Sequence, residues 1–390
     1  MGGSAFASKN LITPRIPPDL YEHVRDHLVL ILRQHFNHVD SAVEAPGKKD
    51  HGDIDILVAE PVDPKGPPKS DQLATWIGAP HWRSTPGSDT FNFAVPWPGS
   101  TEQSVGEEEE ASSSSMHFIQ VDIHICPSAQ SFSWHLFFQA HGDLWNMIGS
   151  IIRRFGLTCN DHGLFLRIAE VEPYNKQLSR VLLTKDPVRV LQYLGLDEHR
   201  YWTRFRSWDE MMDFATSCRF HSPNVANSSS SISLQARLKA SDRQRLRKRP
   251  AFSHWIDTYL PMHSEDPVGH SAHLTREEVV VDAKAWFGEM FTLEFDDRKA
   301  QGMREVRVRK LWTDIRRSLP IEGCEVGLVM KGLKLEIEKE TDEEDHVGGG
   351  DVGLNEARRC YKEGDFEIVN KWAVKNWKNV EERQKVFKLE

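Results

Sequence analysis

Two aspartates at the start of an apolar run are spaced for metal-dependent chemistry. Asp53 and Asp55 lie two residues apart, and because successive side chains of a strand point to opposite faces, both carboxyl groups are expected on the same face. Two ionised carboxylates side by side repel each other, so a neighbouring cation is needed to keep both charged. A hard divalent ion such as Mg²⁺, which binds oxygen ligands, meets that need.

A third aspartate lies in a strand-like segment further along the chain. Residues 119–125 alternate without a break, with isoleucines and valine on one face and Gln120, Asp122 and His124 on the other. If this strand lies beside the one that begins at Asp53, Asp122 completes a three-carboxylate site for two ions of Mg²⁺ or Mn²⁺. Such a site stabilises the attacking and leaving oxygens of an in-line phosphoryl displacement. The alternative is a half-exposed antiparallel sheet whose polar face is simply solvated.

The elements predicted around these residues form an α+β fold, with a mixed sheet and helices on one face. Apolar residues at three- and four-residue spacing predict a helix over residues 20–36. A short strand over 53–58 follows a glycine-containing turn, and strands over 90–95 and 117–125 form a hairpin. The polar, repetitive stretch at about 98–115 is expected to be a disordered acidic and serine-rich loop at the tip of that hairpin.

The turn and the first strand read Gly52-Asp53-Ile54-Asp55-Ile56. Together with the helix before it and Asp122 in a later strand, this motif resembles the DNA polymerase β-like nucleotidyltransferase superfamily, over about residues 20–155. The resemblance implies an enzyme that moves a nucleoside monophosphate from an NTP to a hydroxyl and releases pyrophosphate. It also implies that the three aspartates hold two Mg²⁺ ions and that Asp122 helps to activate the acceptor hydroxyl.

The resemblance and the composition together divide the chain into three expected domains. Residues 1–130 are expected to form the nucleotidyltransferase catalytic domain. Residues 131–262 are predicted to be mainly helical and look similar in kind to the helical domain of poly(A) polymerases and CCA-adding enzymes, which implies substrate binding. Residues 263–390 are expected to form a C-terminal accessory α/β region.

The expected nucleotide-binding turn departs from the superfamily in one place. The Gly-Ser pair that contacts the triphosphate corresponds here to Asp40-Ser41, and an acid beside a phosphate is unfavourable. The lysines and the histidine of the next turn are placed to compensate, although they suit a solvated loop equally well. The candidate nucleotide contacts are therefore Ser41, Lys48, Lys49, His51 and Gly52.

A basic segment is the candidate contact for nucleic acid. Residues 237–249 carry seven cations against one acid in a chain of net charge −9, and such a run suits a phosphate backbone. The 3′ end of an RNA is the acceptor that this favours. A solvated helix face is an equal alternative for the segment; for the chain, transfer to a protein or a small molecule, or a non-catalytic RNA- or protein-binding module, remain open. The predicted RNA contacts are Arg243, Arg245, Arg247, Lys248 and Arg249.

Composition narrows the remaining classes of protein. The chain is 39% hydrophobic and 27% charged, which excludes a wholly disordered protein. No run approaches the roughly 20 apolar residues of a membrane span, and no secretory signal is visible, so an intracellular protein, cytoplasmic or nuclear, is expected. Five scattered cysteines suggest neither a disulfide framework nor a zinc site. The lack of a G-x-x-x-x-G-K-[ST] loop disfavours a P-loop NTPase.

Overall fold

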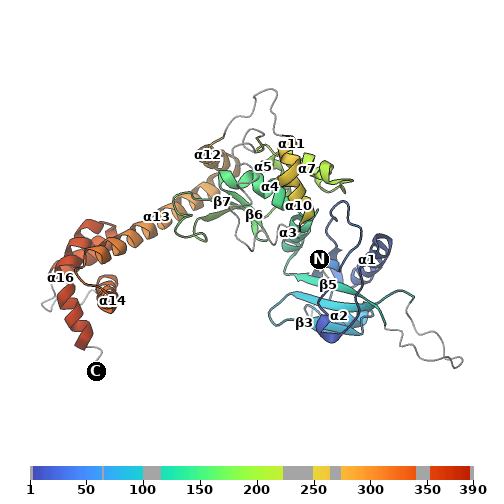
Figure 1. The fold of residues 1–390 in the computed structure, drawn as a ribbon, viewed down its shortest axis with the longest axis horizontal. Coiled ribbons are helices and arrows are strands. Elements are labelled where there is room, and N and C mark those ends of the chain that lie inside the picture. Colours follow the sequence, from blue (N-terminus) through green and yellow to red (C-terminus); the bar gives the residue numbers. More distant parts are fainter. Residues whose placement is uncertain are drawn as a thin grey trace. The chain divides into compact units, whose positions relative to one another are not determined.

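The computed structural model describes residues 3–63, 66–99, 116–222, 249–263, 274–339 and 352–386, which form a mixed α+β structure (Figure 1). The chain divides into two compact units. The first comprises Met1–Leu166 and Leu182–Gly288, and the second comprises Arg167–Val181 and Glu289–Glu390. The acidic and serine-rich loop expected at about 98–115 lies, from residue 100 onward, outside the described residues.

A five-stranded sheet of mixed direction forms the centre of the first unit, in the order β1-β2-β5-β4-β3. The inner strands β2 and β5 are parallel, and every other neighbouring pair is antiparallel. The predicted hairpin is confirmed, because β4 and β5 pair antiparallel in register from Thr90 with His124 to Pro96 with Phe118. The strands are β1 (Phe36–Asp40), β2 (Ile54–Pro61), β3 (His81–Ser84), β4 (Thr90–Pro96) and β5 (Phe118–Cys126).

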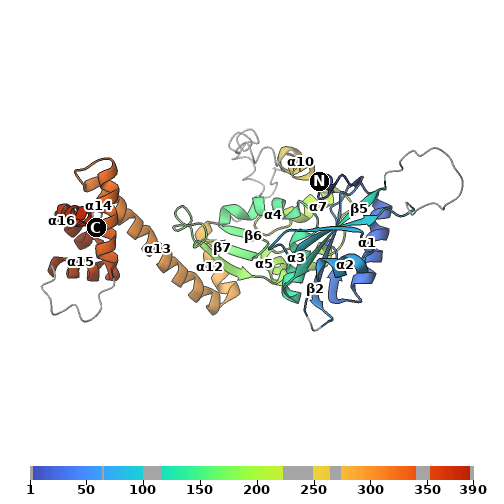
Figure 2. The same ribbon diagram turned by 90° about the horizontal axis from the view of Figure 1, so that it is seen from below.

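Helices α1 (Pro18–Leu32) and α2 (Ser70–Trp76) cover one face of this sheet (Figure 2). Proline at the first position of α1 suits a helix start, where its missing N–H costs no hydrogen bond. The apolar side chains of β2 and β5, such as Ile54 and Val121, are fully buried beneath the two helices. This burial fixes the register, since a one-residue slip would turn those side chains to the opposite face.

A third helix, α3 (Ala129–Gln139), packs on the opposite face of the sheet. Its Phe132 joins Leu57, Ala59 and Cys126 in a small buried cluster. The expectation of helices on one face only is therefore wrong. Only Pro127 and Ser128 separate β5 from α3. Ser128 caps the helix by accepting a hydrogen bond from the backbone N–H of Ser131.

The remainder of the first unit is largely helical, with a smaller sheet in the order β6-β7-β8. The division between the two units falls within β7 and β8, after Leu166 and before Leu182. The elements are α4 (Leu144–Ile152), η2 (Arg153–Phe155), β6 (Leu157–Asn160), β7 (Gly163–Arg167), β8 (Arg180–Thr184), α5 (Pro187–Leu194), α6 (Glu198–Tyr201), α7 (Trp208–Thr216), α10 (Pro250–His254), η4 (Trp255–Tyr259), α11 (Leu260–Met262) and α12 (Arg276–Phe287).

The second unit is built on helices α13 (Glu289–Ser318), α14 (Cys324–Glu338), α15 (Val352–Glu363) and α16 (Phe366–Val386). The described part of residues 263–390 contains no strand, so the expected C-terminal α/β region is a helical one. Leu311 and Ile315 on α13, and Leu319 just after its end, recur every four residues and are buried in a core shared with α14, α15 and α16. None of the helices in the described ranges is long and apolar enough to cross a membrane.

Candidate active site

Two of the predicted aspartates are direct neighbours across the central strands. Asp55 on β2 pairs in parallel register with Asp122 on β5, so the two side chains emerge side by side from the same face. Asp53 lies two residues before Asp55, just ahead of β2. The structure therefore brings together three residues that lie far apart in the sequence. Within the described residues, their carboxylate oxygens do not all lie within 4.8 Å of one another.

Burial and the neighbouring negative charges raise the pKa values of Asp55 and Asp122. Protein atoms crowd around the carboxyl of Asp55, and this partial loss of hydration, together with the charges of Asp53 and Asp122, raises its pKa to about 7. The pKa of Asp122 is raised by burial and by Asp53, against hydrogen bonds that lower it. Concentrated negative charge with hard oxygen donors fits one or two divalent cations such as Mg²⁺, which would relieve the repulsion.

Two amide side chains hold Asp122 in place. Asn92 on β4 donates from Nδ2 at 2.8 Å, and Gln120 donates from Nε2 at 3.0 Å. Both bonds end on the same oxygen, Oδ1. Because two charge-assisted bonds converge on one oxygen, the carboxylate keeps a single orientation. Asn92 lies directly opposite Asp122 in the β4–β5 register, so the pairing of the strands creates this contact.

An N-terminal segment, residues 3–6, lies on the sheet face that carries the aspartates. The backbone N–H of Gly3 donates to Oδ2 of Asp53 at 3.2 Å, and that of Ala5 donates to Oε1 of Gln120 at 2.9 Å. Phe6 is fully buried against residues of β4 and β5. Sequence reasoning missed this segment, because its few apolar residues follow no helical or strand period.

Ser41 and Asp40 close the edge of the site next to β2. The hydroxyl of Ser41 donates to the backbone oxygen of Asp55. Its backbone N–H donates to Oδ1 of Asp40 at 2.8 Å. Asp40 therefore engages a backbone donor that would otherwise be available to an anion.

The other predicted nucleotide contacts have different surroundings. Lys48 forms an ion pair with Glu44, and its charge also acts to lower the pKa of Asp55. His51 is 4% exposed, and its ring stacks on Tyr21 with centroids 3.7 Å apart. This position makes His51 part of the packing, whereas Lys49 is exposed to solvent. Gly52 is buried, and its carbonyl oxygen lies so close to Gly3 that a Cβ on Gly3 would approach it to 2.5 Å.

Glu44 is a charged residue near the site that the sequence did not single out. It accepts a hydrogen bond from the hydroxyl of Tyr21 at 2.7 Å and lies 3.9 Å from Nδ1 of His51. Burial opposes its ionisation, but the Lys48 ammonium and the hydrogen bonds hold its pKa below the ordinary value. Glu44 thus adds a further negative charge that raises the pKa of Asp55.

Most of the basic segment lies outside the described residues. Arg243, Arg245, Arg247 and Lys248 belong to that part, and Arg249 is the described member. Its Nη1 lies 3.2 Å from Oδ1 of Asp143, which precedes α4. Arg249 thus joins the start of α10 to the start of α4 within the first unit.

An open hollow of about 1050 Å³ connects the turn of Lys48 with the helical part of the first unit. Trp208 bridges the two sides, because its indole N–H donates to the backbone oxygen of Pro46 at 3.1 Å. The hollow combines aromatic and cationic side chains, a composition that suits a flat base attached to an anionic group. The aromatic and cationic residues of its lining are Lys48, Phe138, Trp145, Arg153, Trp208, Arg249 and Phe252.

No known protein family and no curated protein matches the chain. Among solved structures, the chain is similar to a polymerase β from Leishmania infantum, in the crystal structure of its ternary P/T complex. The TM-score is 0.33 and the identity 13%, over 50% of this chain and 78% of that chain. A similarity this weak assigns neither a fold family nor an activity to the chain.

Proposed function

We propose that the protein is a nucleotidyltransferase that moves a nucleoside monophosphate from an NTP to a hydroxyl acceptor, with release of pyrophosphate. The observation that carries the proposal is the parallel register of Asp55 and Asp122, with Asp53 close enough to perturb both. Bound Mg²⁺ or Mn²⁺ would supply charge neutralisation at the attacking and leaving oxygens. Asp53, Asp55 and Asp122 are the residues that would hold these ions.

The surrounding residues support a role for Asp122 in activating the acceptor. Asn92 and Gln120 both bind Oδ1 of Asp122, which also fixes the direction in which Oδ2 points. A carboxylate with a raised pKa is a better proton acceptor than an ordinary aspartate at neutral pH. We therefore assign to Asp122 the role of orienting the acceptor hydroxyl and accepting its proton.

The hollow beside Lys48 is the proposed place for the nucleotide. Lys48 lines the hollow and its charge acts on Asp55, and the Ser41 hydroxyl donates to the backbone oxygen of Asp55, so both are candidates for the phosphate groups. Trp208 and Phe252, which are partly exposed, offer flat surfaces for a base. His51 is assigned a packing role instead, because its ring is buried against Tyr21.

The acceptor we propose is the 3′ end of an RNA. The support is the sequence of residues 237–249, whose seven cations contrast with a net charge of −9 for the whole chain. Arg249, at the described end of this segment, also lines the hollow. An RNA strand bound at Arg249 would therefore approach the same hollow as the nucleotide.

Labelled NTPs with Mg²⁺ or Mn²⁺, incubated with the protein and total RNA, test the proposal directly. Label is expected on RNA for the native protein and at background level for Asp55→Asn and Asp122→Asn. His38→Gln, which alters an exposed side chain of β1, serves as the matched control and should retain full transfer. Label on the protein itself would indicate that the acceptor is a protein and not RNA. Nucleotide binding without any transfer under all conditions would contradict the enzyme and favour a binding module.

A further inference from the structure

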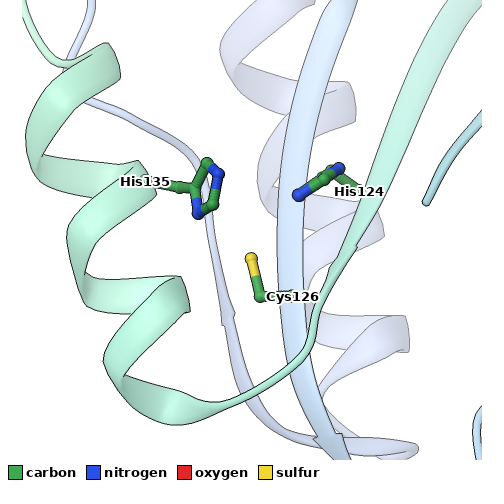
Figure 3. A group of neighbouring side chains, drawn as sticks. All are labelled: His124, Cys126 and His135. Carbon is green, nitrogen blue, oxygen red and sulfur yellow. The ribbon is translucent and has the colours of Figure 1, made fainter. Parts of the chain in front are cut away.

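A second cluster of metal-binding side chains lies beside the aspartates, on the same sheet face. His124 and Cys126 follow Asp122 at two-residue steps along β5, and His135 faces them from α3 (Figure 3). One potential ligand atom of each residue lies within 4.8 Å of the others. Among the residues that the structure describes, this is the group of three that meets the distance expected around a shared ion.

Both imidazoles are held by partners of the kind that orient metal-bound histidines. Nδ1 of His135 lies 2.7 Å from the backbone oxygen of Ser131, which can only accept, so Nδ1 carries the proton and Nε2 keeps its lone pair. Nδ1 of His124 lies 2.9 Å from the hydroxyl of Thr90. The Ser131 carbonyl therefore fixes the tautomer of His135, and the Thr90 hydroxyl, which can donate or accept, orients the ring of His124.

The surroundings of the thiol also suit a metal. Cys126 is 3% exposed and lies in the apolar cluster of Leu57, Ala59 and Phe132. The two imidazole rings lie 5.0 Å apart between centroids, at 49°, and both histidines are partly exposed. The sulfur therefore has an apolar setting, and the partly exposed histidines leave room for water as a fourth ligand.

We propose that His124, Cys126 and His135 bind one zinc ion, with a fourth position open to water or another small ligand. Two nitrogens and one sulfur are a ligand set that zinc favours and that Mg²⁺, which needs oxygen ligands, does not. Binding replaces the thiol proton by the metal: the S–H bond breaks, the S–Zn bond forms, and one proton is released to solvent. No oxidation or reduction is involved.

The proposed ion joins two elements that flank the aspartates. Asp122 and His124 are separated by about 7 Å along β5, which is two steps of a strand. His135 lies on α3, so a bound ion ties α3 to β5 at this point. A bound ion would therefore hold α3 against the end of β5, the strand that carries Asp122.

Titration of the EDTA-treated, dialysed protein with Co²⁺ tests the site through its absorption spectrum. A sulfur ligand gives a thiolate-to-cobalt charge-transfer band, whereas carboxylate ligation at the aspartates gives none. We expect this band to saturate at about one Co²⁺ per chain and to disappear when Zn²⁺ displaces the cobalt. The double variant Asp55→Asn/Asp122→Asn should keep the band, so the result does not depend on the proposed nucleotidyl transfer.

Variants of the cluster complete the test. Cys126→Ser should lose the band, and His135→Gln, at a partly exposed position, should weaken Co²⁺ binding strongly while circular dichroism confirms the fold. Thr90→Val should weaken it by about 10–100-fold by removing the partner of His124. Cys324→Ser changes an exposed thiol on α14 and should leave binding unchanged. The proposal is wrong if the native protein gives no charge-transfer band, or if folded His135→Gln binds Co²⁺ as the native protein does.

Discussion

At the scale of single residues, Asp55 is the position where folding and the proposed function oppose each other. Its pKa rises to about 7, from an ordinary value near 4, because of crowding and the charges of Asp53 and Asp122. The folded protein thus holds more protons on this residue than the unfolded chain does between those two pH values. Stability without metal should therefore fall as the pH rises through this range.

The substitution Asp55→Asn removes that opposition. We expect the variant without metal to unfold at a higher temperature than the native protein at pH 8, and at a nearly equal temperature at pH 4. Thermal unfolding in EDTA at both pH values measures the difference. Asp63→Asn, outside the site, controls for the loss of one negative charge. A lower unfolding temperature of Asp55→Asn at pH 8 would show that the carboxylate stabilises the fold.

His141 provides a pH dependence of the opposite sign. Its ring is fully buried, Nε2 lies 2.6 Å from the backbone oxygen of Tyr201, and burial lowers its pKa to about 4. Below pH 6.5 the unfolded chain binds a proton that the folded protein does not, so stability falls as the pH drops toward 4, by up to roughly 3 kcal/mol.

Replacing His141 tests this dependence. The residue has a φ of 61°, a backbone conformation that asparagine tolerates. His141→Asn should therefore show a smaller loss of unfolding free energy between pH 6.5 and 4 than the native protein, whatever its stability at pH 7. Urea unfolding at several pH values measures the slope, with the exposed His23→Asn as the control. An unchanged slope in His141→Asn would assign the acid sensitivity to other groups.

At the scale of elements, helix α14 offers two glycines in contrasting positions. A Cβ on Gly332 would lie 2.6 Å from Cγ1 of Val380 on α16, whereas one on Gly327 would meet nothing within 4 Å. Gly332→Ala should therefore destabilise the helical unit by about 1–3 kcal/mol through overpacking. Gly327→Ala should stabilise it by up to about 1 kcal/mol, because alanine favours the helix. Chemical unfolding of the two variants, followed by helical circular dichroism, should shift the midpoint in opposite directions.

Sequence periodicity predicted the elements that have one clearly buried face. Strict alternation predicted β5 and its pairing with β4, and the same reasoning predicted that Asp55 and Asp122 share a face. Strand β1 was not recognised, because Phe36 and Val39 continue the apolar spacing of the helix before it. The C-terminal part was expected to contain strands, because short apolar runs such as Val326–Val329 suit either structure until packing decides.

The clustered histidines and cysteine could not be identified from spacing alone. His124 and Cys126 come from a strand, and His135 comes from the helix that folds back over it. Their spacing matches none of the short zinc motifs, so only the turn at Ser128 brings them together. The signal that was available is the alternation of β5, which places His124 and Cys126 on the face of Asp122.

At the scale of the whole molecule, the distribution of charge matters more than its sum. The net charge is −9, yet residues 237–249 carry seven of the cations against one acid. If RNA is the acceptor, reversing the charge of Arg245, Arg247 and Arg249 should weaken RNA binding. Reversing Arg245 and Arg247 alone should weaken RNA binding and leave NTP binding intact, because Arg249 also lines the hollow. Each lost phosphate contact should flatten the slope of log affinity against log salt by about 0.7.

Filter binding at several salt concentrations measures that slope. The matched control is charge reversal at Arg307, Lys310 and Arg317, three exposed cations of α13 in the second unit. This control should leave the slope unchanged. Equal slopes for the native protein and the variant at Arg245, Arg247 and Arg249 would remove the basic segment as the RNA contact, and the proposal for the aspartates would stand.

The parallel pairing of β2 with β5 has a consequence for the order of folding. β1 with β2, and β4 with β5, are antiparallel partners that are consecutive strands of the sequence. Each ribbon closes only a local loop, whereas joining β2 to β5 closes a long one at a greater entropic cost. Asp55 and Asp122 face each other across this pair of strands, which forms last. Regain of secondary structure during refolding would therefore precede regain of transfer activity. Repulsion between the two carboxylates would slow the pairing of β2 with β5, and a divalent cation bound between them would speed it up.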